Sequence, residues 1–432
     1  MIATSGPLRS KVKSLLDRVA RMGGRNALLY TVTTVLSRGA VLVLAPLYTR
    51  KLAPADYGDI ALAQTLVSVV PTFVSLGLLA ALSRFFFEGA DAKEGIARAG
   101  HVARWIVALG LGAALFLQAL VFVLPLPHTG LFQARNLSCI VWGATGSLLI
   151  AIPLVVLRSA QRAAFASAIQ LVDFAVNLGS ALILVAWLGR GFQGALEATG
   201  IAGCVSTLVG SLYVFRAMPG RLDRAEFRRA LVFALPYVPH FAANQLLLVS
   251  DRWLLKAFGF DGALGIYSLA SQLAAPVTMV VLAWNEAVSP RVGESFRAGG
   301  IAAMRSEERT VVRSYLYLSG GVSAALVLAS PIAILFFGAA YAKALWFLPG
   351  LCVVMILETF YYPYSTYLFF MDRTKDIPKI TVVAGIVNVC CNLALIPLLG
   401  VPGAIVSRAL GGGVRSAASA YWARSGMKRA TA

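Results

Sequence analysis

The sequence predicts an all-α polytopic membrane protein with about twelve transmembrane helices. Three observations carry this prediction: the composition, the spacing of the apolar runs and the distribution of basic residues. Of the 432 residues, 59% are hydrophobic and 13% are charged, and the mean hydropathy is +0.77. Soluble domains are nearer half apolar and about a quarter charged. The apolar excess extends along the whole chain, as expected of a protein that crosses the membrane many times.

The apolar runs are long enough to cross the hydrocarbon core, which takes about 20 residues of helix. Twelve such runs are separated by short polar or charged segments. They cover residues 26–49, 60–83, 105–125, 137–157, 166–188, 195–215, 230–250, 264–289, 311–337, 345–370, 378–399 and 402–422. No connector is long. The chain therefore offers little room for the extramembrane part in which a membrane glycan polymerase or ligase usually carries out its chemistry.

The basic residues indicate the orientation of these spans. If both chain ends are cytoplasmic, 29 of the 38 Lys and Arg residues fall on the cytoplasmic side and 7 on the other side. Arg38 and Arg408 lie within spans. Cytoplasmic connectors carry an excess of Lys and Arg in membrane proteins. The sequence thus predicts twelve spans with both termini in the cytoplasm, and residues 216–229 and 290–310 on that side.

Residues 1–25 come before the first span and are not a cleaved signal, because the apolar run that follows is too long. Leu8, Val12, Leu15 and Leu16 are among several apolar residues at helical spacing, with Arg and Lys between them. This pattern suits a basic amphipathic helix on an anionic leaflet. A disordered basic tail is the alternative, and the sequence leaves both open.

No motif for catalysis, metal binding or nucleotide binding emerges. The five cysteines lie inside apolar runs without metal-ligand spacing, and the three histidines are scattered. The stretch "GGGVRS" (411–416) lacks the spacing and the lysine of a phosphate-binding loop. The net charge is +19, but the basic residues that produce it fall mostly between apolar runs and not on one face of a soluble domain. A nucleic-acid partner is therefore not expected. We therefore predict no enzyme, no metal and no cofactor.

The chain also contains an internal repeat. A shift of 211 residues aligns 157–189 with 368–400 without a gap and places Arg162 on Arg373, Asn177 on Asn388 and Gly189 on Gly400. A second shift, of 207 residues, places Arg84 on Arg291. Six-span repeats insert with the same orientation and are related by a pseudo-two-fold axis along the membrane normal. The repeat predicts two parallel six-helix bundles with a substrate site between them, as in transporters.

Several stretches resemble the oligosaccharide flippase branch of the multidrug/oligosaccharidyl-lipid/polysaccharide exporter superfamily. They are "LSRGAVLVLAPLYTRKLAPADYGDIAL" (36–62), "LGLLAALSRFFFEG" (76–89), "ALPYVPHFAANQLLLVSDRWLLKAFG" (234–259), "LGIYSLASQLAAP" (264–276) and "GIVNVCCNLALIPLLGVPGAIVS" (385–407). The resemblance implies a bacterial inner-membrane protein that carries undecaprenyl-pyrophosphate-linked oligosaccharides to the periplasmic leaflet. A polysaccharide polymerase is then a candidate partner.

The predicted domains follow from the spans and the repeat. They are a basic segment 1–25, an N-terminal bundle 26–215, a connector 216–229, a C-terminal bundle 230–422 and a tail 423–432.

Charged residues within or beside the spans are the candidate site residues. Arg38 lies deepest, and a guanidinium there would bind a pyrophosphate bidentately or form an ion pair with a buried acid. Arg84 and Arg291 are related by the repeat, although topology alone also explains them. Asp173 and Glu358 are the deep acids, suited to pairing with Arg38 or to coupling an ion.

Three further charges, Asp251, Arg252 and Lys256, end the seventh span on the predicted outer side, where positive-inside topology disfavours cations. Arg252 and Lys256 share a helix face. The cluster is either the outer mouth of a cavity or an interfacial salt bridge.

Two other functions compete with a flippase. An ion-coupled drug or cation antiporter of the same superfamily would favour acids in its cavity, as Asp173 and Glu358 would provide. A glycan polymerase or ligase would need a larger loop. The arginines favour an anionic substrate.

Overall fold

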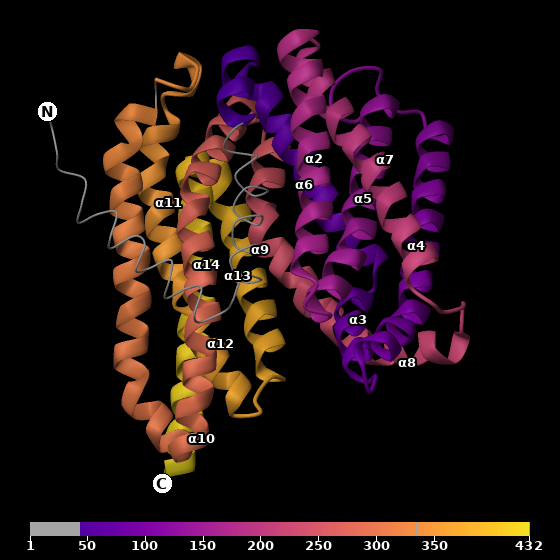
Figure 1. The fold of residues 1–432 in the computed structure, drawn as a ribbon. Helices are drawn as coiled ribbons and strands as arrows, with labels where there is room; N and C mark the ends of the chain where they lie inside the picture. Colours follow the sequence, from indigo (N-terminus) through magenta and orange to yellow (C-terminus); the bar gives the residue numbers. More distant parts are fainter. Residues whose placement is uncertain (1–43, 334, 432) are drawn as a thin grey trace, which may run out of the picture. The chain divides into compact units, whose positions relative to one another are not determined.

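A computed structural model of the protein describes residues 44–333 and 335–431, and over these ranges the chain forms helices joined by short turns, with no strand (Figure 1). Nine of the described helices, or continuous helix pairs, are long and apolar enough to cross a membrane. The prediction of an all-α polytopic membrane protein is confirmed. Residues 1–25 and Arg38 lie outside the described residues, as does most of the first predicted span (26–49), whose last residues, 44–49, belong to a helix that runs to residue 51.

The chain divides into two compact units. Among the described residues, the first unit consists of residue 44 and residues 74–235, and the second of residues 45–73 and 236–431. The helices of unit 1 are α3 (Leu78–Phe87), α4 (Ala92–Val123), α5 (Ala134–Ser159), α6 (Ala163–Ala181), the π-helix η1 (Leu182–Trp187), α7 (Gly191–Ala217) and α8 (Arg224–Ala234).

Unit 2 contains a helix from the first half of the sequence, α2 (Pro54–Val74), apart from its last residue. Its other helices are α9 (Val238–Ala257), α10 (Asp261–Ala333), η3 (Ala339–Tyr341), α11 (Ala344–Thr359), α12 (Tyr361–Phe370), α13 (Asp376–Leu399) and α14 (Val401–Thr431), with the 3-10 turn η2 (Leu235–Tyr237) before α9. The sequence boundaries 26–215 and 230–422 therefore differ from the packing units at α2 and at α8.

The predicted spans from 60–83 onward each overlap described helices. Two of them, 264–289 and 311–337, fall largely on the two arms of α10, which are separated by the non-helical residues Gly299 and Gly300. Gly300 has a φ of 61° and a ψ of −149°, a conformation that glycine adopts without steric cost. The segment 290–310 was expected to be a connector and is instead a helical extension of both spans.

Helix ends on polar segments are fixed by side-chain caps. The Asp91 carboxylate accepts the N–H of Glu94 at 2.8 Å, and Glu94 in turn accepts the N–H of Ala90 at 2.9 Å. At α8, Asp223 accepts the N–H groups of Ala225 and Glu226. These two donors hold the pKa of the Asp223 carboxyl below its usual value. Acidic caps of this kind satisfy the free N–H groups of a first helical turn.

Helices α5 and α7 of unit 1 pack with their backbones almost in contact. A Cβ atom on Gly146 would lie 2.6 Å from the Cα of Gly203, and one on Gly203 would collide with the backbone of Trp142 and Gly143. Gly210 faces Leu149 in the same way. Small residues permit close helix approach where no hydrophobic effect drives helices together. These glycines form the α5–α7 seam.

The 211-residue repeat is visible in the backbone. Gln161 and Asp372, which are 211 residues apart, both have a positive φ, 56° and 57°. The following N–H groups, of Arg162 and Arg373, each donate to the carbonyl five residues before at 2.9 Å. Gly189 and Gly400 close the two segments with φ values of 61° and 62°. The same turn and the same terminal glycine thus occur in each unit.

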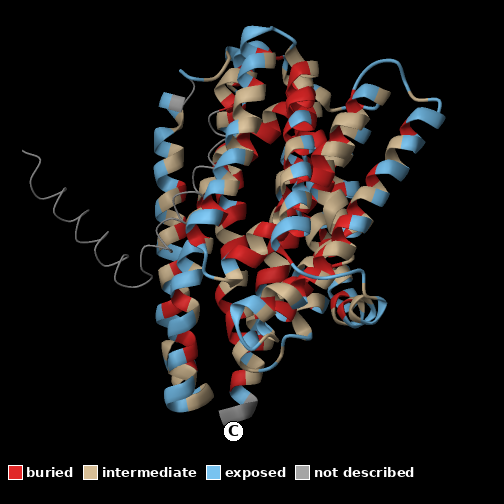
Figure 2. Ribbon diagram, turned by 45° about the vertical axis from the view of Figure 1, so that its right-hand side comes forward, coloured by how far each residue is buried: buried red, intermediate tan, exposed pale blue. Residues whose placement is uncertain are grey.

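Burial follows the helix faces, with buried residues along the inward sides and exposed residues along the outward sides (Figure 2). The core of unit 1 is mostly aliphatic and centres on α3, α4 and α5. Unit 2 has a core rich in tyrosine, including Tyr315, Tyr364 and Tyr367. Large apolar side chains such as Phe116, Trp187 and Leu328 are exposed, as expected of surfaces that face lipid.

Candidate functional site

Unit 2 buries four charged side chains among α9, α11 and α14: Asp251, Glu358, Arg408 and Arg415. A charge in a low-polarity interior costs several kilocalories per mole unless another group compensates it. The partners of each group therefore decide what it can do.

Arg408 and Glu358 form an ion pair inside unit 2. The Nε of Arg408 on α14 lies 3.2 Å from the Oε1 of Glu358 on α11, and the side chains are 8% and 12% exposed. Gly412, one turn beyond Arg408, allows this approach, because a Cβ there would lie 2.7 Å from the Cγ of Glu358. Glu358 was expected to pair with Arg38 or to couple an ion; in the structure its partner is Arg408.

Asp251 is also buried and is held by hydrogen bonds. Its Oδ2 accepts the hydroxyl of Tyr267 on α10, and its Oδ1 accepts the backbone N–H of Arg252 at 2.7 Å. The whole residue is 1% exposed. Asp251 thus lies in the interior of unit 2, where it restrains the backbone at Arg252.

Arg252 follows Asp251 on α9 and is only partly buried. Its Nε is buried and has no hydrogen-bond partner within the described ranges. The ion pairs found in those ranges do not include Arg252.

Lys256, one turn beyond Arg252, has acid partners. Its Nζ lies 2.7 Å from Oδ1 of Asp59 on α2 and forms a second ion pair with Asp261 at the start of α10. The lysine side chain is 28% exposed. Of the two interpretations of the cluster, Lys256 has the contacts of a salt bridge, whereas Arg252 forms no ion pair with the part of the chain that the structure describes.

Arg415 is a buried cation that has no acid partner among residues 44–333 and 335–431. The residue is 7% exposed, and its Nη1 donates to Oδ1 of Asn244 at 3.3 Å. Its guanidinium carbon lies 4.5 Å from the ring centroid of Tyr361. The Nε has no hydrogen-bond partner among the described residues, and neither does the Nδ1 of His240, one helical turn before Asn244. Arg415 thus has polar neighbours, and its Nε–H is a hydrogen-bond donor that no described residue uses.

A neutral polar cluster lies on the neighbouring helices. Asn388 on α13 accepts the hydroxyl of Ser250 on α9 at 2.9 Å and donates to the carbonyl of Ser407 on α14 at 3.2 Å. Asn392 donates to Ser250 and to Asn388. These bonds join α9, α13 and α14 through the repeat-related Asn388.

The remaining predicted residues lie elsewhere. Arg84 on α3 pairs with Glu88 at 3.4 Å and lies over the ring of Phe233, with its side chain 53% exposed. Arg291 on α10 pairs with Glu307 at 3.7 Å and is 66% exposed. Asp173, in unit 1, accepts the hydroxyl of Ser206. Arg84, Arg291 and Asp173 do not belong to the buried cluster of unit 2.

Sequence reasoning missed Arg415, which was counted among the cytoplasmic basic residues, and it left Arg408 undecided. One signal was present: Arg408 and Arg415 are seven residues apart and so share a helix face. Glycines 411 and 412 between them also mark a face that other helices approach closely. No group of three acidic, histidine or cysteine side chains suited to a metal ion occurs in the described ranges.

The helical spans define a polytopic membrane protein, and solved structures of transporters share its fold. A multidrug resistance MATE family transporter of the MOP superfamily, in an inward-facing conformation, aligns with a TM-score of 0.74 and 15% identity over 91% of this chain and 96% of that one. A MOP superfamily transporter from Pyrococcus furiosus, described as having a binding pocket of reverse polarity, aligns with a TM-score of 0.56 and 17% identity over 93% of each chain.

The sequence itself places the chain in a family. The model of the polysaccharide biosynthesis protein family matches residues 24–296, more than half of the chain, and the protein belongs to this family. A Haemophilus influenzae protein described as "Lsg locus putative protein 1" is 22% identical over 400 residues, which cover 88% of this chain and 95% of that protein. The expected membership in the exporter superfamily is confirmed.

Proposed function

We propose that the protein is a flippase that moves polyprenyl-pyrophosphate-linked oligosaccharide units from the cytoplasmic to the periplasmic leaflet of a bacterial inner membrane by alternating access. The observation that carries this proposal is Arg415, a buried cation whose charge no acid balances within the described ranges. A pyrophosphate would supply the missing negative charge. Guanidinium groups bind phosphate oxygens bidentately and stay protonated when desolvated.

Arg252 adds a second cation on the same unit. Its buried Nε has no hydrogen-bond partner among the described residues, and Asp251 fixes the backbone at that point. Lys256, Arg84 and Arg291 are secondary candidates, because each already has an acid partner. Arg38 is a candidate by its place in the sequence alone. In this proposal the polyprenyl tail stays in lipid while the cations lower the barrier for the headgroup.

An ion-coupled drug or cation antiporter is the second candidate, favoured by the MATE family transporter that shares the fold. Such a transporter needs an acid free to exchange a proton or a metal cation. In unit 2, Glu358 is paired with Arg408 and Asp251 is bonded to Tyr267. These partners weigh against the second candidate. A glycan polymerase or ligase has no observation in its favour; a polymerase is instead a candidate partner.

The two transport functions can be separated with variants of Arg415 in a host that lacks the gene. Arg415→Ala should abolish most of the surface polysaccharide while the protein remains at normal levels in the membrane. Arg415→Lys should restore part of it, because an ammonium keeps the charge and loses the bidentate geometry. The matched control is Arg216→Ala, an exposed cation at the end of α7, which should export normally.

Lipid-linked glycan should accumulate on the cytoplasmic leaflet of the Arg415→Ala cells. Normal glycan export by a stable Arg415→Ala protein would remove the basis of the proposal. Export of cationic dyes that depends on Asp251 or Glu358, with unchanged polysaccharide, would establish the antiporter instead.

A further inference from the structure

His240 lies beside Arg415 in unit 2, although the two residues are on different helices. It is in the first turn of α9, one turn before Asn244, whose Oδ1 accepts Nη1 of Arg415 on α14 at 3.3 Å. The charge of Arg415 acts electrostatically on the His240 ring. The guanidinium and the imidazole are therefore neighbours inside unit 2.

Both side chains have a buried nitrogen that no described residue bonds, Nε of Arg415 and Nδ1 of His240. A buried polar atom without a hydrogen bond costs about 1–3 kcal/mol, so a ligand that bonds both nitrogens recovers that free energy. The Nε–H of arginine can only donate, and both ring nitrogens of a protonated histidine donate. A ligand with several acceptor oxygens fits these two donors.

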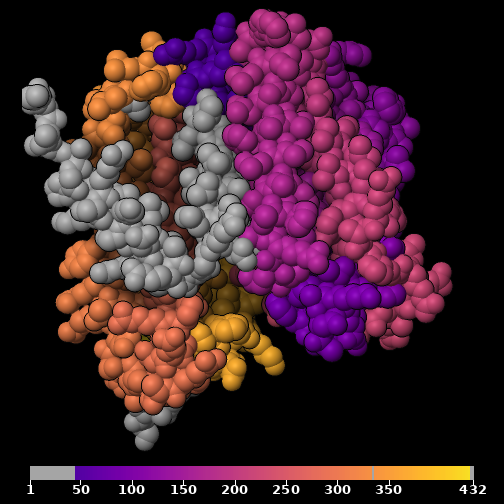
Figure 3. All heavy atoms as spheres, viewed as in Figure 1, coloured from indigo at the N-terminus to yellow at the C-terminus, as the bar shows by residue number. Residues whose placement is uncertain are grey.

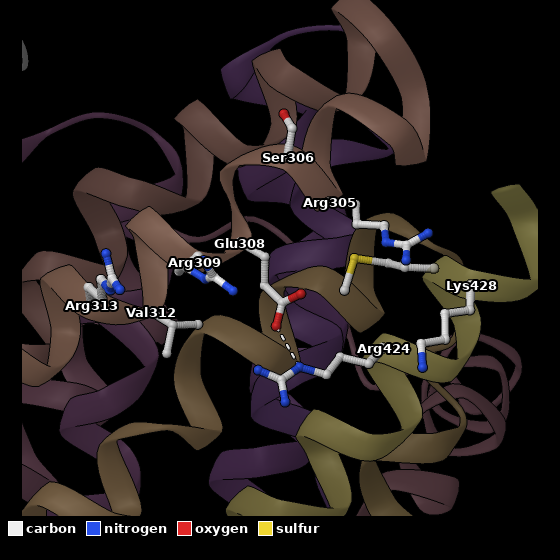
Figure 4. Close-up of a pocket in the computed structure, with 9 residues that line it drawn as sticks. Arg305, Ser306, Glu308, Arg309, Val312, Arg313, Arg424 and Lys428 are labelled. Atoms are coloured by element: carbon white, nitrogen blue, oxygen red, sulfur yellow. Dashed lines mark hydrogen bonds and ion pairs between the residues drawn. The ribbon is translucent and has the colours of Figure 1, made fainter.

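A second arginine of α14 shows what Arg415 lacks. The guanidinium carbon of Arg424 lies 5.4 Å from the ring centroid of Tyr364, and its Nε lies 2.6 Å from Oε1 of Glu308, in the pocket shown in Figure 4. Arg309 of the same pocket is exposed on the second arm of α10, which forms part of the orange surface in Figure 3. Water and salt screen a charge at such a position. Arg415 is buried, and no acid pairs with it within the described part of the chain.

The charge of the proposed substrate requires more than one cation. A pyrophosphate that joins a lipid to a sugar carries a negative charge on each phosphorus, and Arg415 balances one of them. Arg252 lies farther along α9, about 12 Å from Asn244 at 1.5 Å per residue, and would meet the headgroup at another depth in the membrane. Histidine is the side chain whose charge ordinarily changes between about pH 5 and 8. A protonated His240 would place the second positive charge next to the first.

Given the proposed flippase function, on which this assignment rests, we propose that His240 is the second ligand of the substrate pyrophosphate at Arg415. One phosphate binds the guanidinium, and the adjoining phosphate binds the protonated imidazole. Binding takes up a proton from water and weakens as the pH rises, because the neutral ring balances no charge. Proton and pyrophosphate strengthen each other's binding by the same factor.

The charged groups around α9 leave His240 free for this role. Helices α10, α13 and α14 pack against α9, and the charge among the described residues that acts on His240 is that of Arg415. Other charged residues on these helices and on α2 are exposed or have partners of their own: Asp376 and Lys379 on α13, Arg408 on α14, Glu286 on α10, and Asp59 and Asp261 beside Lys256 at the other end of α9.

The test measures the binding of farnesyl-pyrophosphoryl-N-acetylglucosamine to the full-length protein in detergent by titration calorimetry. Both phosphates of this probe are esterified, so it lacks the ionisation near pH 6 of a phosphate monoester. The affinity of the wild-type protein should fall by about fivefold or more between about pH 6 and about pH 8. Titrations in two buffers of different ionisation enthalpy should show proton uptake. His240→Gln keeps a polar side chain that does not titrate, and should bind at both pH values with the weaker affinity.

His101→Gln is the matched control. His101 is a histidine of α4 in unit 1 whose Nδ1 lies 3.1 Å from the carbonyl oxygen of Arg221, and its replacement should leave the pH profile unchanged. Wild-type protein that takes up no proton on binding would overturn the role of His240 whether or not the variants fold. A wild-type pH profile in His240→Gln would do the same, and the proposed function would stand if binding still depended on Arg415. Undiminished binding by Arg415→Ala would overturn both.

Discussion

The Nε of Arg408 and the Oε1 of Glu358 lie 3.2 Å apart inside unit 2, each on a side chain that is about nine-tenths buried. The pair connects α14 to α11. Because a buried ion pair and the hydrophobic residues that could replace it are often similar in stability, its main expected effect is to fix how these two helices pack.

Replacing one partner of this ion pair should destabilise the protein far more than replacing both partners. Arg408→Met leaves the Glu358 carboxylate buried without a partner and should lower the free energy of unfolding by about 3–5 kcal/mol. The double variant Arg408→Met/Glu358→Gln should recover most of this loss. Thermal unfolding of the purified protein measures both. Arg84→Ala, which breaks an exposed pair with Glu88, is the control and should cost under about 1 kcal/mol.

Tyr267 should stabilise the protein through the hydrogen bond that its hydroxyl donates to Asp251, and not through the space that the hydroxyl fills. Tyr267→Phe keeps the ring and leaves a buried carboxylate oxygen without its donor, which should cost about 1–3 kcal/mol. Asp251→Asn in the same background should lower this cost, because an amide is cheaper to bury than a carboxylate. Tyr315→Phe is a suitable comparison, since its hydroxyl donates to the neutral Asn285 and should cost less. Equal losses for the two tyrosines would contradict this interpretation.

Adding a single methyl group at the α5–α7 seam should destabilise the protein. Gly203→Ala places a Cβ against the backbone of Trp142 and Gly143, so the helices must separate, and overpacking of this kind costs about 1–3 kcal/mol. Gly179→Ala on α6 is the control, because nothing lies within 4 Å of the added carbon. There alanine should be neutral or stabilising, by up to about 1 kcal/mol. Unfolding temperatures of the two variants give the comparison.

The membrane orientation can be tested with single cysteines. We expect Leu222→Cys and Ala302→Cys to react with an impermeant reagent only after the cells are opened, and Thr129→Cys to react in intact cells. All three positions are exposed, so the side of the membrane, and not burial, decides their reactivity. Wild-type protein gives the background from its five native cysteines. Strong labelling at 222 or 302 in intact cells would invert the topology.

The spans could be predicted because apolar length and basic flanks act on each helix separately, so no knowledge of its neighbours was needed. The 211-residue repeat could be predicted as well, since a turn such as the one at Gln161 and Asp372 is set by local backbone geometry. The placement of α2 with unit 2 could not, because it depends on close packing of Gly58 against Gly265, 207 residues away.

The charges inside the bundle were the hardest to predict. Depth along a span gave Asp173 and Glu358 as the deep acids; Glu358 is buried, whereas Asp173 is only partly buried. Asp251, which was placed at the outer end of its span, is buried like Glu358. Their partners, Arg408 and Tyr267, lie on other helices, and which helix faces meet is not encoded in the hydropathy of either one. Arg415 was misplaced for a related reason: it falls in the predicted last span (402–422) but was counted with the cytoplasmic cations, whereas α14 continues to Thr431 and Arg415 is buried within its packed part.

The length of α10 has a practical consequence for imaging. The two helical arms of α10 contain 73 residues in all, so their lengths sum to about 110 Å at 1.5 Å per residue, whereas two crossings of the hydrocarbon core use only about 60 Å. Some 25 Å of each arm is therefore left outside the hydrocarbon, on either side of Gly299 and Gly300. Small membrane proteins are hard to align in electron micrographs because lipid hides their outline. This helical hairpin is a natural epitope for a rigid antibody fragment, which would give each particle a recognisable mark without altering the transport path.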